Sequence, residues 1–201
     1  YHRFKEDVKL MAEMGLKTYR FSISWPRVIP TGNGEVNEAG LKFYEDLIDE
    51  CLKYNIEPMV TIFHWDLPQA LVDQYNGFED RRIIDDFVNY SKVLFERFGS
   101  KVKYWITLNE QNVFTSLGWL TAMHPPGKFN DEKTFYQANH HAFMAHAKTV
   151  LLFKQMIPSG KIGASFSYSP SYSIDCNPIN AMSKMDFDDM KNFWWMDMYA
   201  Y

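Results

Sequence analysis

A glutamate stands at the end of a strongly apolar stretch, with amide side chains on both sides of it. Residues 104–108, YWITL, are aromatic, β-branched or aliphatic, which is typical of a buried strand. Asn109, Glu110, Gln111 and Asn112 follow directly, with no turn residue between. A carboxylate at the end of a buried strand is costly to desolvate unless it is paired, hydrogen-bonded or used in chemistry. Glu110 is therefore the first candidate for a catalytic group.

Polar side chains also stand near the ends of three other predicted strands, at 18–24, 57–64 and 161–168. In a sheet of parallel strands joined by helices, the carboxyl ends meet at one mouth, where active sites form. A guanidinium, an imidazole, indoles, an amide and a carboxylate at such a mouth suit a ligand with many hydroxyl groups. The strand-end set is Arg20, Ser22, Trp25, His64, Trp65, Asp66, Asn109, Glu110 and Tyr168.

The elements that would position this set alternate between helix and strand. Helices are predicted over 1–15, 37–54, 67–74, 80–98, 134–156 and from about 180 onward, with a loop between the third strand and residue 134. Asn37 and Asp80 are the expected N-caps of two of these helices. Strands that are each followed by a helix imply parallel pairing with right-handed crossovers.

Two architectures fit this order, an open doubly wound sheet and part of a (β/α)8 barrel. No Gly-rich phosphate-binding fingerprint follows the first strand, which argues against a nucleotide-binding α/β domain. A complete barrel takes about 250 residues or more. Four strands in 201 residues would then form roughly the first half of one, as about four βα units.

Composition narrows the function classes. Apolar residues make up 46% and charged residues 23% of the chain, which is typical of a globular protein, and the formal charge of −4 does not favour nucleic-acid binding. No apolar run is long enough to span a membrane. Cys51 and Cys176 suggest neither a disulfide framework nor a zinc site. The first residue is not Met and the last residues are aromatic, so we expect 1–201 to be one partial domain, truncated at both ends.

Two clusters could suggest other functions, and we interpret both as packing. His140, His141 and His146 lack the i, i+4 spacing of a helical zinc pair and no carboxylate completes a set. No metal or cofactor is therefore expected. The methionines near the C-terminus are expected to fill the core. They are Met182, Met185, Met190, Met196 and Met198.

Three stretches together resemble signature motifs of glycoside hydrolase family 1. They are YRFSISWPR at 19–27, HWDLP at 64–68 and TLNE at 107–110, and YHR at 1–3 resembles the family's start of the first helix. The resemblance runs over the whole chain with the motifs in order. It implies the N-terminal portion of a (β/α)8 barrel and a retaining β-glycosidase.

The resemblance also implies a role for each matched residue. Glu110 matches the general acid/base, which protonates the leaving oxygen and later activates water. Asn109 matches the amide that binds the sugar 2-hydroxyl, and His64 the imidazole that binds the 3-hydroxyl. Arg20 matches the cation that keeps the nucleophilic carboxylate ionised, and Trp65 forms a wall behind His64.

The sequence departs from the family pattern after the acid/base residue. The family usually has Pro there, whereas this chain has Gln111 and Asn112. Such an ending resembles the branch that hydrolyses 6-phospho-β-glucosides, as does the stretch 172–180. The resemblance therefore favours that substrate, a cytoplasmic enzyme, and Asn112 as a further substrate-binding residue. Tyr168 is expected to bind substrate because it stands at a predicted strand end.

The family's nucleophile, the Glu of a T-E-N-G strand, does not occur in this sequence. Asp66 is the only other acid at a predicted strand end, and the family uses it structurally. We therefore predict that the 201-residue chain alone does not hydrolyse glycosides. Two alternatives stay open, an enzyme for unphosphorylated β-glucosides or β-galactosides and a non-catalytic half-barrel that self-associates through its open sheet edges.

Overall fold

Four parallel strands form the centre of the molecule, in a computed structural model that describes residues 1–200. Their order in the sheet follows the sequence, with parallel pairing between each strand and the next. Phe63 pairs with Leu108, and Asn109 with Ser165, so the carboxyl ends of neighbouring strands lie at one edge. The strands are β1 (Thr18–Ser22), β2 (Glu57–Phe63), β3 (Tyr104–Asn109) and β4 (Lys161–Ser165).

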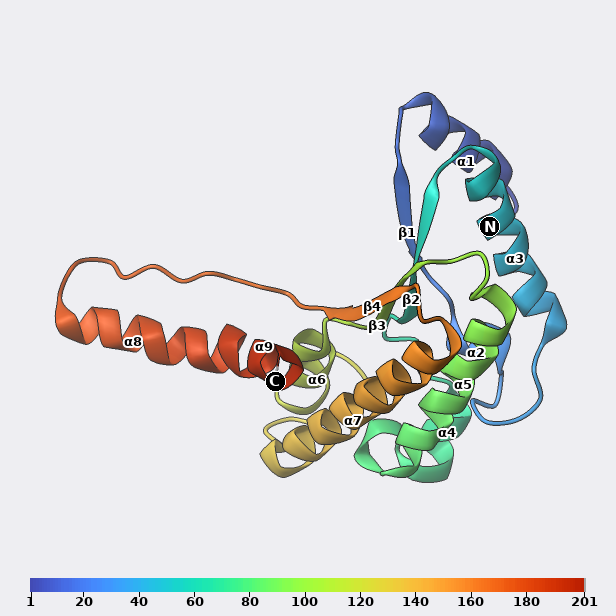
Figure 1. The fold of residues 1–201 in the computed structure, drawn as a ribbon. Coiled ribbons are helices and arrows are strands. Elements are labelled where there is room, and N and C mark those ends of the chain that lie inside the picture. The colour runs from blue at the N-terminus through green and yellow to red at the C-terminus, as the bar shows by residue number, and fades with distance from the viewer. Residues whose placement is uncertain (201) are drawn as a thin grey trace.

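Long helices precede or connect the strands, as the alternating pattern predicts (Figure 1). Apolar residues at helical spacing place Ile83, Ile84, Phe87 and Leu94 of the helix before β3 in the core. By contrast, Arg20 and Ser22 of β1 are exposed. The long helices are α1 (Phe4–Glu13), α3 (Glu38–Lys53), α5 (Arg82–Phe98) and α7 (Glu132–Met156).

One buried tyrosine joins helix α5 to the first two strands. The Tyr90 hydroxyl lies 3.1 Å from the carbonyl oxygens of both Ile23 and Ile62, and its ring stacks on Trp25 at 4.8 Å between centroids. Both aromatic side chains are fully buried. Because a buried phenol needs a hydrogen-bond partner, this contact fixes how α5 lies on the strand ends.

Several local predictions needed correction. Segment 111–119 is not a loop but helix α6 (Gln111–Trp119), although Val, Thr, Ser and Gly give it low intrinsic helix propensity. Asn37 lies at the N-cap position of α3, but its side chain does not cap the helix. Its amide donates to the Arg27 carbonyl at 3.0 Å. Asp80 accepts from the Arg82 amide at 2.8 Å, while Arg81 is the residue before α5. Three more short helices are present, α2 (Trp25–Val28), α4 (Gln69–Tyr75) and the 3-10 helix η1 (Gly77–Glu79).

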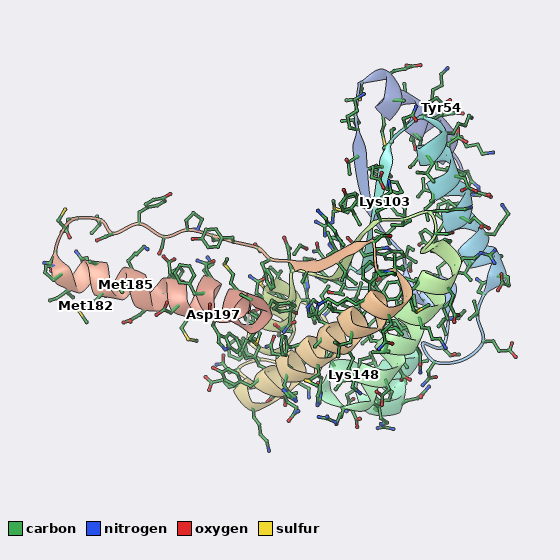
Figure 2. The ribbon with its side chains drawn as sticks, viewed as in Figure 1. Tyr54, Lys103, Lys148, Met182, Met185 and Asp197 are labelled. Carbon is green, nitrogen blue, oxygen red and sulfur yellow. The ribbon has the colours of Figure 1, made fainter. Side chains whose placement is uncertain are left out.

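The C-terminal segment forms an arm that extends away from the sheet and folds back toward α6 (Figure 1). It comprises α8 (Pro178–Asp188), a π-helical turn η2 (Asp189–Phe193) and α9 (Trp194–Ala200). The prediction that its methionines fill the core is wrong for most of them. Met182 and Met185 lie on the arm far from the sheet (Figure 2) and are 65% and 61% exposed. Trp194 and Trp195 are adjacent in α9, and Trp195 is the buried one of the two.

No helix within residues 1–200 is long and apolar enough to cross a membrane.

Candidate active site

Arg20 links three strands at their carboxyl ends. Its Nη2 donates to Asn109 Oδ1 on β3 and to Ser165 Oγ on β4, the latter at 3.2 Å. Its Nε donates to Thr61 Oγ1 on β2 at 3.0 Å. The guanidinium is fixed in place by these bonds, yet the residue as a whole is exposed. A cation held this way can attract an anionic group placed beside it.

The Asn109 side chain is the centre of the polar cluster. Its Oδ1 accepts from Arg20 and from Ser165 Oγ at 3.1 Å, and its Nδ2 lies 3.0 Å from His64 Nε2. The indole of Trp65 donates to the Asn109 backbone carbonyl at 2.7 Å. Asn109 is 4% exposed, so these bonds determine its orientation. The Trp65 and His64 rings also contact each other edge to face, with 5.0 Å between their centroids.

His64 is held as a neutral acceptor toward Asn109. An amide nitrogen donates, so the His64 Nε2 atom must accept and the proton is assigned to Nδ1. Burial and the Arg20 charge lower the pKa of the imidazole, while the Glu110 charge raises it. A neutral imidazole with one donor and one acceptor suits hydrogen bonding to a hydroxyl.

Glu110 occupies an unusual backbone conformation between β3 and α6. Its φ and ψ angles, 46° and 64°, lie in the left-handed region, which non-glycine residues seldom adopt. Its amide donates to the Ser165 carbonyl at 2.8 Å, and its carbonyl accepts from Val113 at 2.9 Å as α6 begins. No hydrogen bond between described residues uses the Glu110 carboxylate, and the residue is half-buried. The carboxyl group is therefore available to a ligand.

Two of the predicted site residues lie differently from the others. Asn112 binds the backbone of Ser167, donating to its carbonyl at 2.8 Å and accepting from its amide at 3.3 Å. Tyr168 was expected at the end of the fourth strand, but β4 ends at Ser165 and Tyr168 lies beyond it, 52% exposed. The structure therefore brings together Arg20, His64, Trp65, Asn109 and Glu110. The Asn112 side chain is bonded to the Ser167 backbone instead, and Tyr168 lies beyond the strand end.

Sequence reasoning missed two residues that orient the cluster, Thr61 and Ser165. Both contact Arg20, and Ser165 also contacts Asn109. Ser165 could have been found only by locating the true end of β4, because 161–168 contains two serines, Ser165 and Ser167, and either could be the strand end. Thr61 is buried and sits mid-strand, where threonine normally indicates packing.

Asp66 does not join this cluster as a second carboxylate. Burial raises the pKa of its carboxyl group, partly offset by Ser24 and by the charge of Arg27. These neighbours belong to the turn after β1 and to α2, and a raised pKa is the opposite of what an ionised nucleophile needs. The structural interpretation of Asp66 fits this environment.

The three helical histidines are separated in role. His141 Nδ1 lies 2.8 Å from the Phe78 carbonyl, His146 Nδ1 lies 2.7 Å from Thr107 Oγ1, and His140 is exposed. Within residues 1–200, no group of His, Cys, Asp and Glu side chains is arranged to hold a metal ion.

Taken together, the strand ends present a free carboxyl group beside an oriented amide, a neutral imidazole, a fixed guanidinium and an indole. The amide and imidazole can bind neighbouring hydroxyl groups of a sugar. The carboxyl group next to them can exchange a proton with an atom of the same ligand. The arrangement is suited to proton transfer on a carbohydrate.

Comparison with known proteins places these observations in a family. Over residues 1–201 the sequence matches glycosyl hydrolase family 1. It is 58% identical over 201 residues to an aryl-phospho-beta-D-glucosidase, BglC, of Bacillus subtilis, covering 100% of this chain and 42% of that protein. It is 42% identical over 212 residues to beta-glucosidase 3 of Arabidopsis thaliana, covering 98% and 41%. The chain thus spans less than half of the length of these relatives.

Solved structures agree with the fold. The rice Os3BGlu6 beta-glucosidase superposes with a TM-score of 0.94 at 37% identity, over 98% of this chain and 44% of that one. The Thermotoga maritima family 1 beta-glucosidase gives 0.90 at 41% identity, over 94% and 42%. The predicted fold class is confirmed, because the parallel sheet with its helices matches the first half of the family's (β/α)8 barrel. The chain belongs to glycosyl hydrolase family 1.

Proposed function

We propose that this chain carries the acid/base half of the active site of a retaining β-glycosidase. The observation that supports the proposal most is the position of Glu110, whose free carboxyl group follows β3 beside the Asn109, Arg20 and His64 cluster. In this role Glu110 protonates the leaving oxygen and then, as a carboxylate, removes a proton from the attacking water. Asn109 and His64 hold the sugar hydroxyls, Trp65 forms the wall behind His64, and Arg20 binds close to the second carboxylate.

The second carboxylate has to come from residues outside this sequence. A retaining pair stands about 5–5.5 Å apart, and Asp66, the other acid near a strand end, is buried toward Ser24 and Arg27. We therefore expect the 201-residue chain alone to leave an aryl β-glucoside and its 6-phosphate intact. Hydrolysis of either compound by the purified chain, lost on Glu110→Gln, would contradict this expectation.

The favoured substrate class is the 6-phospho-β-glucosides. Support comes from the relative with 58% identity, whose name is aryl-phospho-beta-D-glucosidase, and from Gln111 and Asn112 after the acid/base position. Such substrates place the enzyme in the cytoplasm, where sugar phosphates arise on uptake. Other relatives, at 42–48% identity, are named as beta-glucosidases or a glucan glucohydrolase, which supports an unphosphorylated substrate as the alternative.

A substrate comparison separates the two alternatives. The full-length protein that carries this chain should hydrolyse p-nitrophenyl β-glucoside 6-phosphate with a kcat/KM at least about 100-fold above that for p-nitrophenyl β-glucoside, because charged groups that bind a phosphate are worth several kcal/mol. The matching β-galactosides serve as the control for sugar specificity. Equal or higher kcat/KM on the unphosphorylated sugar would overturn the preference for phosphate.

A further inference from the structure

The left-handed backbone of Glu110 raises the question of what holds it. Residues in sparsely populated backbone regions persist only when the surrounding structure fixes them, and such residues cluster at active sites. The peptide bonds of Glu110 itself contribute through Ser165 and Val113, at 2.8 and 2.9 Å. The next residue, Gln111, makes further contacts that hold this backbone.

Gln111 is completely buried, and both polar atoms of its side-chain amide are hydrogen-bonded. Its Nε2 donates to Asn139 Oδ1 at 2.9 Å and to the Asn139 carbonyl at 3.1 Å, while its Oε1 accepts from the Tyr199 hydroxyl. Asn139 is in turn held by a bond from its own Nδ2 to the Phe135 carbonyl at 2.9 Å. Burial raises the pKa of the Tyr199 phenol, which therefore stays protonated and donates.

The network connects the catalytic strand end to two distant helices. Asn139 lies in α7, 28 residues from Gln111, and Tyr199 lies in α9, 88 residues from it. The Tyr199 ring packs against His146 of α7 and Phe166 after β4, at 4.4 and 4.8 Å between centroids. The Gln111 side chain is therefore fixed from two sides, and a fixed Gln111 limits how far the peptide plane that joins it to Glu110 can turn.

We propose that Gln111 is a positioning residue for Glu110, whose hydrogen bonds to Asn139 and Tyr199 keep the acid/base carboxyl group aimed at the leaving oxygen. This inference rests on the proposed function, because it assigns Gln111 a role only if Glu110 transfers a proton. Gln111 itself is fully buried and does not contact the substrate. Its effect is on the direction of the neighbouring carboxyl group.

The leaving group of the substrate distinguishes positioning from general structural support. A phenolate is a poor leaving group and needs protonation by the acid, whereas 2,4-dinitrophenolate departs without it. In the full-length protein, Gln111→Leu should lower kcat/KM about 100-fold on the phenyl β-glucoside 6-phosphate, but less than about 3-fold on the dinitrophenyl compound. If the wild type prefers unphosphorylated sugars, the phenyl and 2,4-dinitrophenyl β-glucosides take the place of these two 6-phosphates.

Two further variants guard against misfolding. Tyr199→Phe removes one hydroxyl and keeps the ring, and it should change the ratio of the two substrates in the same direction by a smaller factor. Asn192→Leu is the matched control, because Asn192 is also a buried amide, bonded to Ser169 at 3.0 and 3.1 Å on the arm. It should leave the ratio unchanged.

The outcomes separate this inference from the proposed function. Equal losses on both substrates for Gln111→Leu, or no loss, would overturn the positioning role, and Tyr199→Phe decides the matter if Gln111→Leu does not fold. Glu110→Gln is measured in parallel. If Glu110→Gln keeps full activity on the phenyl compound, the proposed function itself fails.

Discussion

The buried imidazole of His146 should make the stability of the fold depend on pH. Thr107 Oγ1 donates to the Gly163 carbonyl at 3.1 Å, so toward His146 Nδ1, 2.7 Å away, it accepts a hydrogen bond from the ring N–H. Burial lowers the pKa of this histidine from 6.5 to about 4. The folded chain therefore keeps His146 neutral where the unfolded chain would protonate it.

This difference gives stability a definite pH dependence. Between pH 6.5 and about 4 the unfolded state binds more protons at His146, so the free energy of unfolding falls as pH falls, by about 3 kcal/mol in total. The contribution is fully present above pH 6.5 and lost below pH 4. Urea unfolding of the wild type and His146→Gln between pH 7.5 and 4.5 should show a shallower slope for the variant.

His140→Gln is the matched control, because His140 is exposed on the same helix. It should keep the wild-type slope. An identical slope for His146→Gln and the wild type would show that the imidazole is not held neutral.

At the residue scale, the sequence predicts the catalytic candidates better than the residues that hold them in place. Glu110, Asn109, His64 and Arg20 stand in motifs and at strand ends, and the structure brings them together. Ser165 could not be identified, because its role depends on where β4 ends and on the register of Asn109 with Ser165. Contacts between residues that are far apart in the sequence leave no pattern in the residues around either of them.

Among the elements, α6 and the loop after it are held by one carboxylate. Glu79 of η1 accepts from the Trp119 indole at 2.9 Å and from Lys128 Nζ at 2.8 Å. Its side chain is only 13% exposed, whereas that of Lys128 is 40% exposed. The Trp119 donor is buried with the end of α6, so it depends on this partner.

Removing the carboxylate should therefore destabilise the fold. Glu79→Ala leaves the buried Trp119 N–H without its partner, which costs about 1–3 kcal/mol in the free energy of unfolding. Urea unfolding at pH 7 measures the effect. Glu96→Ala is the control, because that side chain is 56% exposed and lies 3.7 Å from Lys92, and its unfolding midpoint should not move. Equal midpoints for the two variants would contradict the role of Glu79.

Long periodic elements follow from the sequence, and short ones do not. The apolar spacing of α5 and α7 predicts both within a few residues, since each buries one face along many turns. Helix α6 lacks that pattern and forms because Phe114 and Trp119 are buried after a left-handed Glu110. Tertiary contacts overrode local propensity there.

On the scale of the whole molecule, the sheet has two edges. Within residues 1–200, β1 and β4 each pair on one side only, and the arm presents apolar side chains to solvent. Tyr172, Ile174 and Ile179 are 86%, 90% and 73% exposed. Unpaired strand edges and exposed apolar surface both favour association.

We therefore expect the 201-residue chain to self-associate when it is purified on its own. Size-exclusion chromatography with light scattering at increasing concentration should give masses above that of one 23.7 kDa chain. Ile174→Lys together with Ile179→Lys should shift the distribution toward monomer, whereas Lys154→Glu, at an exposed position of α7, should not. A monomer at all concentrations would contradict the expectation.

The central claim, that Glu110 is the acid/base of a retaining glycosidase, is tested most directly by chemical rescue. In the full-length protein, Glu110→Ala removes the base that activates water, so the glycosyl intermediate should accumulate. Azide is a small anion that attacks without a base and fits the space that the carboxyl group leaves. With 2,4-dinitrophenyl β-glucoside 6-phosphate, we predict that azide restores turnover of Glu110→Ala and yields the β-glycosyl azide. Wild-type rates for the variant without azide, or no azide product, would contradict the claim.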